Sequence, residues 1–418
     1  MRYTIPYGRS GSQELTTDLP ITVLEPNDVA VEDQEQLLKR SLSSPLGSES
    51  FESFLDRSSS LLLIVNDATR PTPTARVLET LQPRLEKVDD LRIIVATGAH
   101  RAPTEDEYRF ILGNTYDAFR PKAFAHDARN DDDMEYLGTS SNGTEMYLNR
   151  AVKESDGIIP IGSVEPHYFA GYTGGRKSFL PGVASYRTIE MNHKHALSDG
   201  SASLALQGNP VHEDMADAMK VLDDLRIFSI QTVLTADHRI YAVTAGGIHE
   251  SFDAAVERAD EVFCSRLSAK ADIVITVAPY PMDIDLYQSQ KALDNGKLAL
   301  KDGGVIIMVS HCRDGVGEDT FLKLLSSQND PQGVMDTISR GYKLGYHKAA
   351  KMAQIGTWAR MYAVMGLPDD ILRRSLLEPF PDVQSAFDSA VDLLQGEGRK
   401  DLSVVLMPQG SLTVPRLK

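Results

Sequence analysis

Short runs of apolar residues alternate with amphipathic stretches along most of the chain. Runs such as Leu61–Val65 and Ile273–Val277 are almost continuously apolar, which is typical of strands that are buried on both faces of a parallel sheet. The stretches between such runs repeat apolar residues at helical spacing. The predicted strands are Leu61–Val65, Leu91–Ala96, Gly157–Ile161, Phe228–Leu234, Ile240–Val243, Ile273–Val277, Val305–Val309 and Ser403–Met407, and the predicted helices include Pro73–Leu85, Thr104–Leu112, Phe252–Leu267, Leu286–Leu300 and Val383–Leu394.

Strands that alternate with helices predict an α/β fold. We expect two domains, each with a mostly parallel sheet flanked by helices, because 418 residues exceed the usual size of one domain. A charged helical pattern ends near Ser268–Ala271, and a new alternation of strands and helices begins there. The predicted domains are therefore residues 1–268 and 269–418, with the active site in the interdomain cleft.

Composition and charge disfavour several classes of protein. The net charge of −16 argues against nucleic acid or an anionic membrane as the main partner. Two cysteines, Cys264 and Cys312, are too few for a disulfide framework. The N-terminal segment MRYTIPYGRS lacks the apolar run of a secretory signal, and no stretch reaches about 18 apolar residues. We therefore expect a cytoplasmic protein that binds neither nucleic acid nor membrane.

Polar residues follow several predicted strands at the end where α/β folds bind their ligands. Three strands of the first domain and one of the second are followed in this way, and such a repeated pattern favours a functional site over solvated loops. The residues are Asp67, Thr69, Arg70, His100 and His167 in the first domain, and Tyr287, Gln288 and Lys291 in the second.

The turn Gly174–Lys177, with the sequence GGRK, lies between two histidines, His167 and His193. Its glycines allow the backbone to approach a ligand closely, and its Arg–Lys pair suits a phosphate or a carboxylate. The turn does not match a P-loop, because Arg176 stands where the motif requires its second glycine. No GxGxxG fingerprint follows a predicted strand either, so the sequence predicts an anion site of another kind.

Taken together, these segments resemble the lactate racemase family, which comprises nickel-pincer-nucleotide-dependent racemases and epimerases of 2-hydroxyacids. The resemblance extends from the first predicted strand to the middle of the second domain, with the segments in the expected order. The matching segments are DATRP at Asp67–Pro71, ATGAHR at Ala96–Arg101, HYFAGYTGGRKS at His167–Ser178, NH at Asn192–His193 and YQSQKA at Tyr287–Ala292.

The resemblance implies a role for each matching residue. Lys177 resembles the lysine that anchors the cofactor, and His193 resembles the protein ligand of nickel. His100 and His167 resemble the paired general acid and base. The other implied contacts are Asp67, Thr69, Gly174, Gly175 and Arg176 with the cofactor, and Arg70, Lys291, Tyr287 and Gln288 with the substrate.

The implied cofactor is the nickel-pincer nucleotide, a pyridinium-3-thioamide-5-thiocarboxylic acid mononucleotide that holds nickel and is covalently attached to Lys177. Separate cofactor-biosynthesis enzymes would supply it. The implied reaction is temporary oxidation of a 2-hydroxyacid to a 2-keto acid, with one histidine for each hydroxyl orientation. The family resemblance allows lactate, malate, a longer 2-hydroxyacid or a sugar acid as the substrate.

Two other interpretations of the same residues remain open. A histidine-based metallohydrolase would use His100, His167 and His193 as metal ligands, with an activating carboxylate and an open coordination position. A non-catalytic anion-binding module would use the glycine turn together with Arg70 and Lys291.

Four further residues have ordinary structural interpretations. We expect His126 to be structural, and His195 to be solvated or to lie behind His193. His212 is expected to support the start of a helix. Trp358, the only tryptophan, lies in an apolar stretch with helical spacing, and we expect it in the core.

Overall fold

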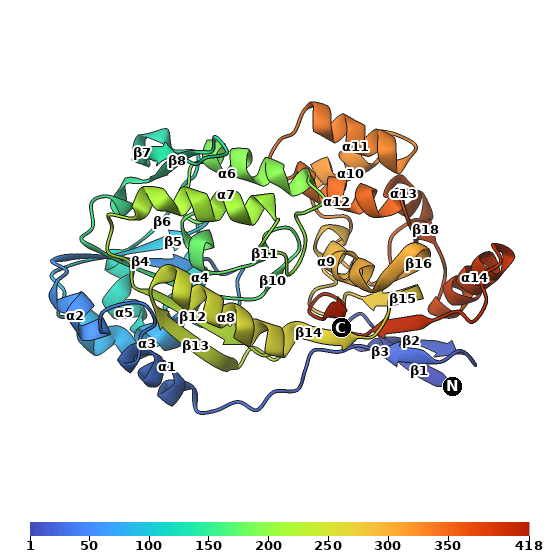
Figure 1. Ribbon diagram of the computed structural model, residues 1–418, viewed down its shortest axis with the longest axis horizontal. Helices are drawn as coiled ribbons and strands as arrows, with labels where there is room; N and C mark the ends of the chain where they lie inside the picture. The colour runs from blue at the N-terminus through green and yellow to red at the C-terminus, as the bar shows by residue number, and fades with distance from the viewer. Residues whose placement is uncertain (418) are drawn as a thin grey trace. The chain divides into compact units, whose positions relative to one another are not determined.

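The computed structural model describes residues 1–417, which form two compact units (Figure 1). The central unit is Asp28–Val262, and the composite unit combines Met1–Asn27 with the chain from Phe263 onward. The predicted division into residues 1–268 and 269–418 therefore differs from the structure in where residues 1–27 and 263–268 belong, since both segments are part of the composite unit. The physical reason is the strand β3 (Ile21–Val23), which pairs with β19 (Val404–Met407) and extends the sheet of the composite unit.

A six-stranded sheet forms the middle of the central unit. Its neighbouring strands run parallel except for one outer pair, which is antiparallel. In sheet order the strands are β13 (Ile240–Gly246), β12 (Ser229–Leu234), β9 (Gly157–Ser163), β4 (Ser60–Asn66), β5 (Asp90–Ala96) and β6 (Ala123–Ala125).

Alternating side chains of β4 show how this sheet is covered. Leu61, Leu63 and Val65 point to one face, because successive side chains of a strand point to opposite sides. They share a fully apolar core with residues of α1 to α4. The helices of the central unit are α1 (Gln34–Ser43), α2 (Phe51–Asp56), α3 (Thr74–Leu85), α4 (Glu105–Leu112), α5 (Tyr116–Phe119), α6 (Tyr186–His193), α7 (Pro210–Ala218) and α8 (Ile248–Phe263), the last of which ends at the unit boundary.

The composite unit has a second six-stranded sheet, in which all neighbouring strands are parallel. The N-terminal hairpin of β1 (Arg2–Tyr7) and β2 (Gly11–Thr16) packs Ile5 and Leu15 into the core of this unit (Figure 1). In sheet order the strands are β18 (Glu378–Pro379), β17 (Arg360–Met365), β16 (Leu300–Ser310), β15 (Ala271–Val277), β19 and β3, and the helices are α9 (Leu286–Gly296), α10 (Asp319–Leu325), α11 (Pro331–Arg340), α12 (Tyr346–Gly356), α13 (Asp369–Arg374) and α14 (Val383–Gly396).

The predicted fold class, two α/β units with mostly parallel sheets, is confirmed, and every predicted strand occurs. The helix predicted over Phe252–Leu267 is displaced: it ends at Phe263 because the next residues form β14 (Cys264–Leu267), which pairs with β20 (Val414–Leu417). The prediction for Trp358 was wrong, because this residue lies partly exposed in the turn after α12. Within residues 1–417, no helix is long and apolar enough to cross a membrane.

Three adjacent strands of the central sheet end at the same edge, because β9, β4 and β5 are parallel neighbours. A hydroxyl group connects two of these ends. Thr72 Oγ1 lies 2.6 Å from Asn66 Nδ2, at the end of β4, and 2.8 Å from Ser163 Oγ, at the end of β9. The loops that follow the three strands carry the predicted polar residues.

Candidate active site

The Asp67 carboxylate and the His100 imidazole form a hydrogen-bonded pair. Asp67 follows β4 and His100 follows the adjacent strand β5. His100 Nδ1 lies 2.8 Å from Asp67 Oδ2, while Asp67 Oδ1 accepts from Thr69 Oγ1 at 2.6 Å. An ionised carboxylate can only accept hydrogen bonds, so Nδ1 carries the proton in the neutral ring. The lone pair of His100 is therefore on Nε2.

Asp67 keeps its negative charge although it is buried. Only 8% of the residue is exposed, and this burial raises the pKa of Asp67. The hydrogen bonds from His100 and Thr69, together with the positive charge of Arg70, outweigh the burial and leave the pKa of Asp67 below its ordinary value. In the structure Asp67 contacts His100, and Thr69 donates a hydrogen bond to Asp67. The contact of Asp67 and Thr69 with a cofactor stays a prediction.

His167 has the opposite hydrogen-bond arrangement. It ends β10 (Pro166–His167), which forms a small antiparallel hairpin with β11 (Gly171–Tyr172). The backbone N–H of Ala170, in the turn of this hairpin, donates to His167 Nδ1 at 3.2 Å. Because an N–H group can only donate, Nδ1 holds the lone pair and Nε2 carries the proton in the neutral ring.

The Lys177 amine lies 3.4 Å from His167 Nε2. Burial is the largest of the effects that lower the pKa of Lys177, and the nearby charges of Arg70 and Arg176 lower it further. Glu165 acts in the opposite direction but does not offset them, so the pKa lies well below 10.5. A neutral amine can accept the hydrogen bond of His167 Nε2–H, and it is also nucleophilic.

Phe169 brings together three of the residues that the sequence predicts for the site. Its ring centroid lies 4.6 Å from that of His167, 5.1 Å from that of His193 and 5.4 Å from Lys177 Nζ. Only 2% of Phe169 is exposed. An apolar side chain within a polar motif carries no chemical signal of its own, which is why sequence reasoning missed this residue.

Packing requires both glycines of the GGRK turn. Gly174 and Gly175 have φ of +78° and +52°, a region that favours glycine. A Cβ atom on Gly174 would lie 2.5 Å from Val164 Cγ2, and one on Gly175 would lie 2.9 Å from the Phe252 ring. The backbone N–H of Gly175 donates to Gln231 Oε1 at 3.0 Å. The predicted cofactor contact of these glycines is thus not needed to explain why glycine occurs here.

Arg176 stabilises the turn from within. Its Nη2 donates to the carbonyl oxygens of Ala170 at 2.8 Å and Tyr172 at 3.3 Å, and its guanidinium lies 4.5 Å from the Phe252 ring. Burial lowers the pKa of Arg176 to about 9, against an opposing effect of Asp253. These contacts give Arg176 a structural role, and its predicted contact with a cofactor remains untested.

His193 is the last residue of α6 and is 7% exposed. Its Nδ1 atom lies 3.2 Å from Oδ1 of the preceding residue, Asn192. The structure therefore brings together six predicted residues of the central unit by direct contacts: Asp67, Thr69 and His100 form one group, and His167, Lys177 and His193 form another around Phe169. The charge of Arg70 acts on both groups, since it lowers the pKa of Asp67 and of Lys177.

The remaining predicted site residues, Tyr287, Gln288 and Lys291, lie in the first half of α9 in the composite unit. Residues three and four apart share a helix face, so Lys291 lies on the side of both Tyr287 and Gln288. Lys348, which the sequence analysis did not identify, donates from Nζ to the Tyr287 carbonyl at 2.5 Å and lies 3.7 Å from the ring centroid. Burial, followed by Glu318 and Asp285, raises the pKa of Tyr287.

Other histidines have structural environments. His126 is buried and its Nε2 lies 2.9 Å from the Ala184 carbonyl oxygen, as its structural interpretation predicts. His212 lies in the first turn of α7, but the side chain that caps this helix is that of Asn209. Among residues 1–417, no three His, Cys, Asp or Glu side chains are placed to hold a metal ion together.

Two family models match the chain in order. The lactate racemase N-terminal domain matches residues 7–204, and the lactate racemase C-terminal domain matches residues 267–414. The lactate racemase of Thermoanaerobacterium thermosaccharolyticum is 35% identical over 353 residues, which is 81% of either chain. The lactate racemase of Lactiplantibacillus plantarum is 32% identical over 312 residues, which is 72% of either chain.

Solved structures agree with these matches. The lactate racemase apoprotein from Thermoanaerobacterium thermosaccharolyticum matches with a TM-score of 0.89 and 30% identity, over 100% of both chains. A protein from Thermotoga maritima shares the fold with a TM-score of 0.65 and 16% identity, over 92% of this chain and 98% of that one. The chain belongs to the lactate racemase family and is an isomerase of the racemase type.

Proposed function

We propose that this enzyme interconverts the enantiomers of a 2-hydroxyacid through a 2-keto acid, with His100 and His167 as the paired general base and general acid. The observation that carries the proposal is their opposite arrangement at Nδ1. The carboxylate of Asp67 accepts from His100, whereas the backbone N–H of Ala170 donates to His167. In their neutral forms, one ring therefore offers a lone pair at Nε2 and the other offers a proton there.

This arrangement suits a reaction in which a proton is removed and later restored on opposite sides of a planar intermediate. His100 Nε2 accepts the hydroxyl proton of one enantiomer, and the Asp67 carboxylate stabilises the imidazolium that results. His167 Nε2–H donates a hydrogen bond to the oxygen of the keto group and stabilises the negative charge that develops there when the opposite face is reduced. The His100 imidazolium then returns its proton to that oxygen, so that both rings end neutral. The reverse reaction uses the same atoms, with His100 Nε2 again as the base, and a positioned general base contributes about 10²- to 10⁴-fold to the rate.

The residues present fit the nickel-pincer nucleotide. Lys177 has the lowered pKa that a lysine needs to attack an activated carboxyl group and form a covalent link. His193 and Lys177 both lie near the Phe169 ring, and imidazole is a suitable ligand for nickel. When bound, the cofactor would accept hydride from the substrate α-carbon and return it to either face. Cofactor-biosynthesis enzymes would be the partners that supply it.

For the substrate carboxylate, we propose Arg70 as one anchor and Lys291 as another, with Tyr287 and Gln288 as supporting contacts. Arg70 is close enough to Asp67 and Lys177 to shift the pKa of both, so it lies where a substrate that reaches His100 would present its carboxylate. A guanidinium binds a carboxylate with two parallel hydrogen bonds. Lactate, malate, longer 2-hydroxyacids and sugar acids all carry the required carboxylate and hydroxyl.

A non-catalytic anion-binding module would use the same cations, but it does not agree with an isomerase of the racemase type. It gives no role to the Asp67–His100 pair, because a bound anion needs no base. Loss of both His100 and His167 would leave such a module intact, whereas it would abolish a racemase.

The first prediction concerns the ionisation of Lys177 in protein produced without the cofactor-building enzymes. Competitive acetylation with trace acetic anhydride from pH 5 to 10 should give Lys177 a midpoint far below that of Lys220, whose pKa is raised by Asp217. A lowered pKa makes Lys177 neutral, and thus reactive, at a lower pH. Arg70→Gln should raise the Lys177 midpoint, because it removes a nearby positive charge. Arg101→Gln, in an exposed loop, should not.

A Lys177 midpoint equal to that of Lys220 would contradict the proposed nucleophilic amine. The competitive design compares each lysine with itself across the pH range, so the partial burial of Lys177 does not affect the midpoint.

The second prediction concerns the fate of the α-hydrogen. Cofactor-loaded enzyme, given a 2-hydroxyacid with deuterium on the α-carbon, should form the opposite enantiomer with most of the deuterium retained. Retention is expected because a hydride held within the site does not exchange with water. Mass spectrometry of the separated enantiomers measures it, and loss of the label to solvent at the rate of racemisation would show that the α-hydrogen leaves as a proton.

The third prediction tests the two anchors of the carboxylate. Arg70→Lys and Lys291→Ala should each lower kcat/KM for the best 2-hydroxyacid by about 10- to 150-fold, since a hydrogen bond to a charged group contributes about 1.5–3 kcal/mol. An ammonium group cannot replace the two-pronged contact of a guanidinium. The matched controls are Arg76→Lys on α3 and Lys323→Ala on α10, both of which are exposed. Near-normal kinetics for both anchor variants would mean that the carboxylate binds elsewhere.

A further inference from the structure

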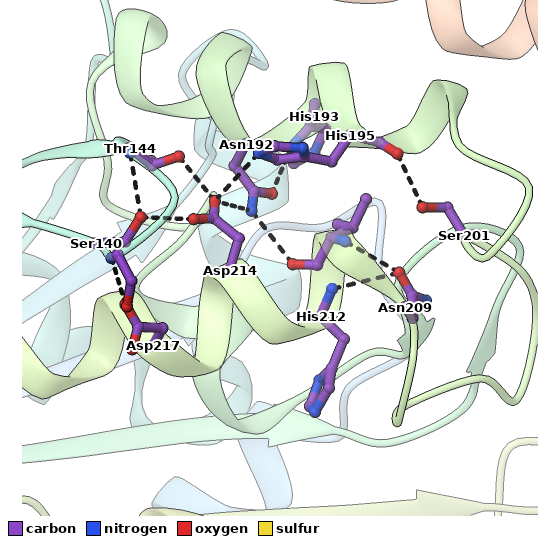
Figure 2. Close-up of polar contacts among 12 residues, drawn as sticks. Ser140, Thr144, Asn192, His193, His195, Ser201, Asn209, His212, Asp214 and Asp217 are labelled. Atoms are coloured by element: carbon purple, nitrogen blue, oxygen red, sulfur yellow. Dashed lines mark hydrogen bonds and ion pairs between the residues drawn. The ribbon is translucent and has the colours of Figure 1, made fainter.

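Asp214, on α7, is a carboxylate that is fully buried in the central unit (Figure 2). Its Oδ1 accepts from Ser140 Oγ at 2.6 Å, and its Oδ2 accepts from Thr144 Oγ1 and from Asn192 Nδ2, both at 2.8 Å. His195 Nε2 lies 4.0 Å from Oδ2. A buried carboxylate is stable only when donors surround it. Each of these donors is therefore held in a fixed orientation.

The orientation of the Asn192 amide follows from its two partners. Asn192 is fully buried, and its Nδ2 donates to the Val211 carbonyl oxygen at 3.2 Å as well as to Asp214 (Figure 2). Both partners can only accept, so the amide nitrogen has to face them. The amide oxygen then has to point the other way.

The amide oxygen of Asn192 faces the His193 ring, 3.2 Å from Nδ1. Because this oxygen can only accept, His193 Nδ1 has to carry the proton, and the lone pair of the neutral ring is on Nε2. Thus the hydrogen-bond chain from Asp214 through Asn192 to His193 permits one neutral tautomer. This tautomer is the one that can bind a metal ion through Nε2.

We propose that Asn192 and Asp214 are positioning residues that hold His193 in the tautomer with a nickel-binding Nε2. The inference rests on the proposed function, in which His193 is the protein ligand of nickel. The negative charge of Asp214, relayed through the amide, also makes His193 a stronger ligand. Loss of such an outer partner typically weakens metal binding by about 10- to 100-fold.

The test compares Asn192→Leu, which removes the amide at similar size, with Asp214→Asn, which keeps the size of the side chain but removes the charge and replaces one acceptor oxygen by an NH2 donor. The matched control is Asp217→Asn on the same helix, because Asp217 accepts from Ser141 and Lys220. No hydrogen bond is drawn between Asp217 and Asn192 (Figure 2). Thermal midpoints of all three variants show whether they fold.

The first measurement is the protonation of the His193 ring in protein without cofactor, by NMR of ¹⁵N-histidine-labelled enzyme. The His193 signals are assigned from their loss in His193→Gln. Wild type and Asp217→Asn should carry the proton on Nδ1, whereas Asn192→Leu should show the Nε2–H tautomer as well. A wild-type His193 with its proton on Nε2 would overturn the inference, even if Asn192→Leu did not fold.

The second measurement is the half-time of nickel loss to EDTA from the cofactor-loaded enzyme. Asn192→Leu should lose nickel about 10- to 100-fold faster than wild type, Asp214→Asn should show a smaller change in the same direction, and Asp217→Asn should show none. If Asn192→Leu matched the control in both measurements, the positioning role would be wrong. A changed tautomer with unchanged nickel loss would instead refute the assignment of nickel to His193, which belongs to the proposed function.

Discussion

The chemistry of this site depends on what faces one atom, Nδ1, in each of three histidines. A carboxylate faces Nδ1 of His100, a backbone N–H faces Nδ1 of His167, and an amide oxygen faces Nδ1 of His193. None of these partners can change between donor and acceptor, so each fixes where the neutral ring carries its proton. The three imidazoles are chemically identical in the unfolded chain. In the folded enzyme their neutral rings carry the proton on different atoms, which is why we propose them as a base, an acid and a metal ligand.

Strand pairing and a hairpin turn place the partners of His100 and His167. Asp67 and His100 meet because their strands are parallel neighbours whose carboxyl ends lie at one edge of the sheet. The amide that faces His167 belongs to the turn of its own hairpin. The positive charge of Arg70 lowers the pKa of both Asp67 and Lys177. It therefore helps to keep Asp67 ionised and Lys177 neutral.

Much of the fold could be predicted from the sequence, because continuous apolar runs such as Leu61–Val65 identify buried parallel strands. The placement of residues 1–27 could not, since β3 has three residues and its pairing with β19 joins positions almost at opposite ends of the chain. Trp358 lies in a stretch whose apolar residues have helical spacing, which predicted a place in the core. The helix α12 ends at Gly356, however, so Trp358 falls in the turn that follows it.

The candidate site shows a similar division. Reactive residues such as His100 and Lys177 stand out by their chemistry and spacing, and the structure places both in contact with other predicted residues. Phe169 and Asp214 could not be recognised, because their importance comes from what they touch after folding. Arg176 looked like a ligand-binding cation in the sequence, but its contacts with the carbonyl oxygens of the turn are visible only in three dimensions.

The proposed function depends on His100 and His167 carrying their protons on different ring nitrogens. NMR of ¹⁵N-histidine-labelled enzyme without cofactor, at a pH where the imidazoles are neutral, tests it directly, with assignments from His100→Gln and His167→Gln. The account predicts Nδ1–H for His100 and Nε2–H for His167, and it predicts that Asp67→Asn changes His100 but not His167. The same tautomer at both histidines in the wild-type enzyme would contradict it.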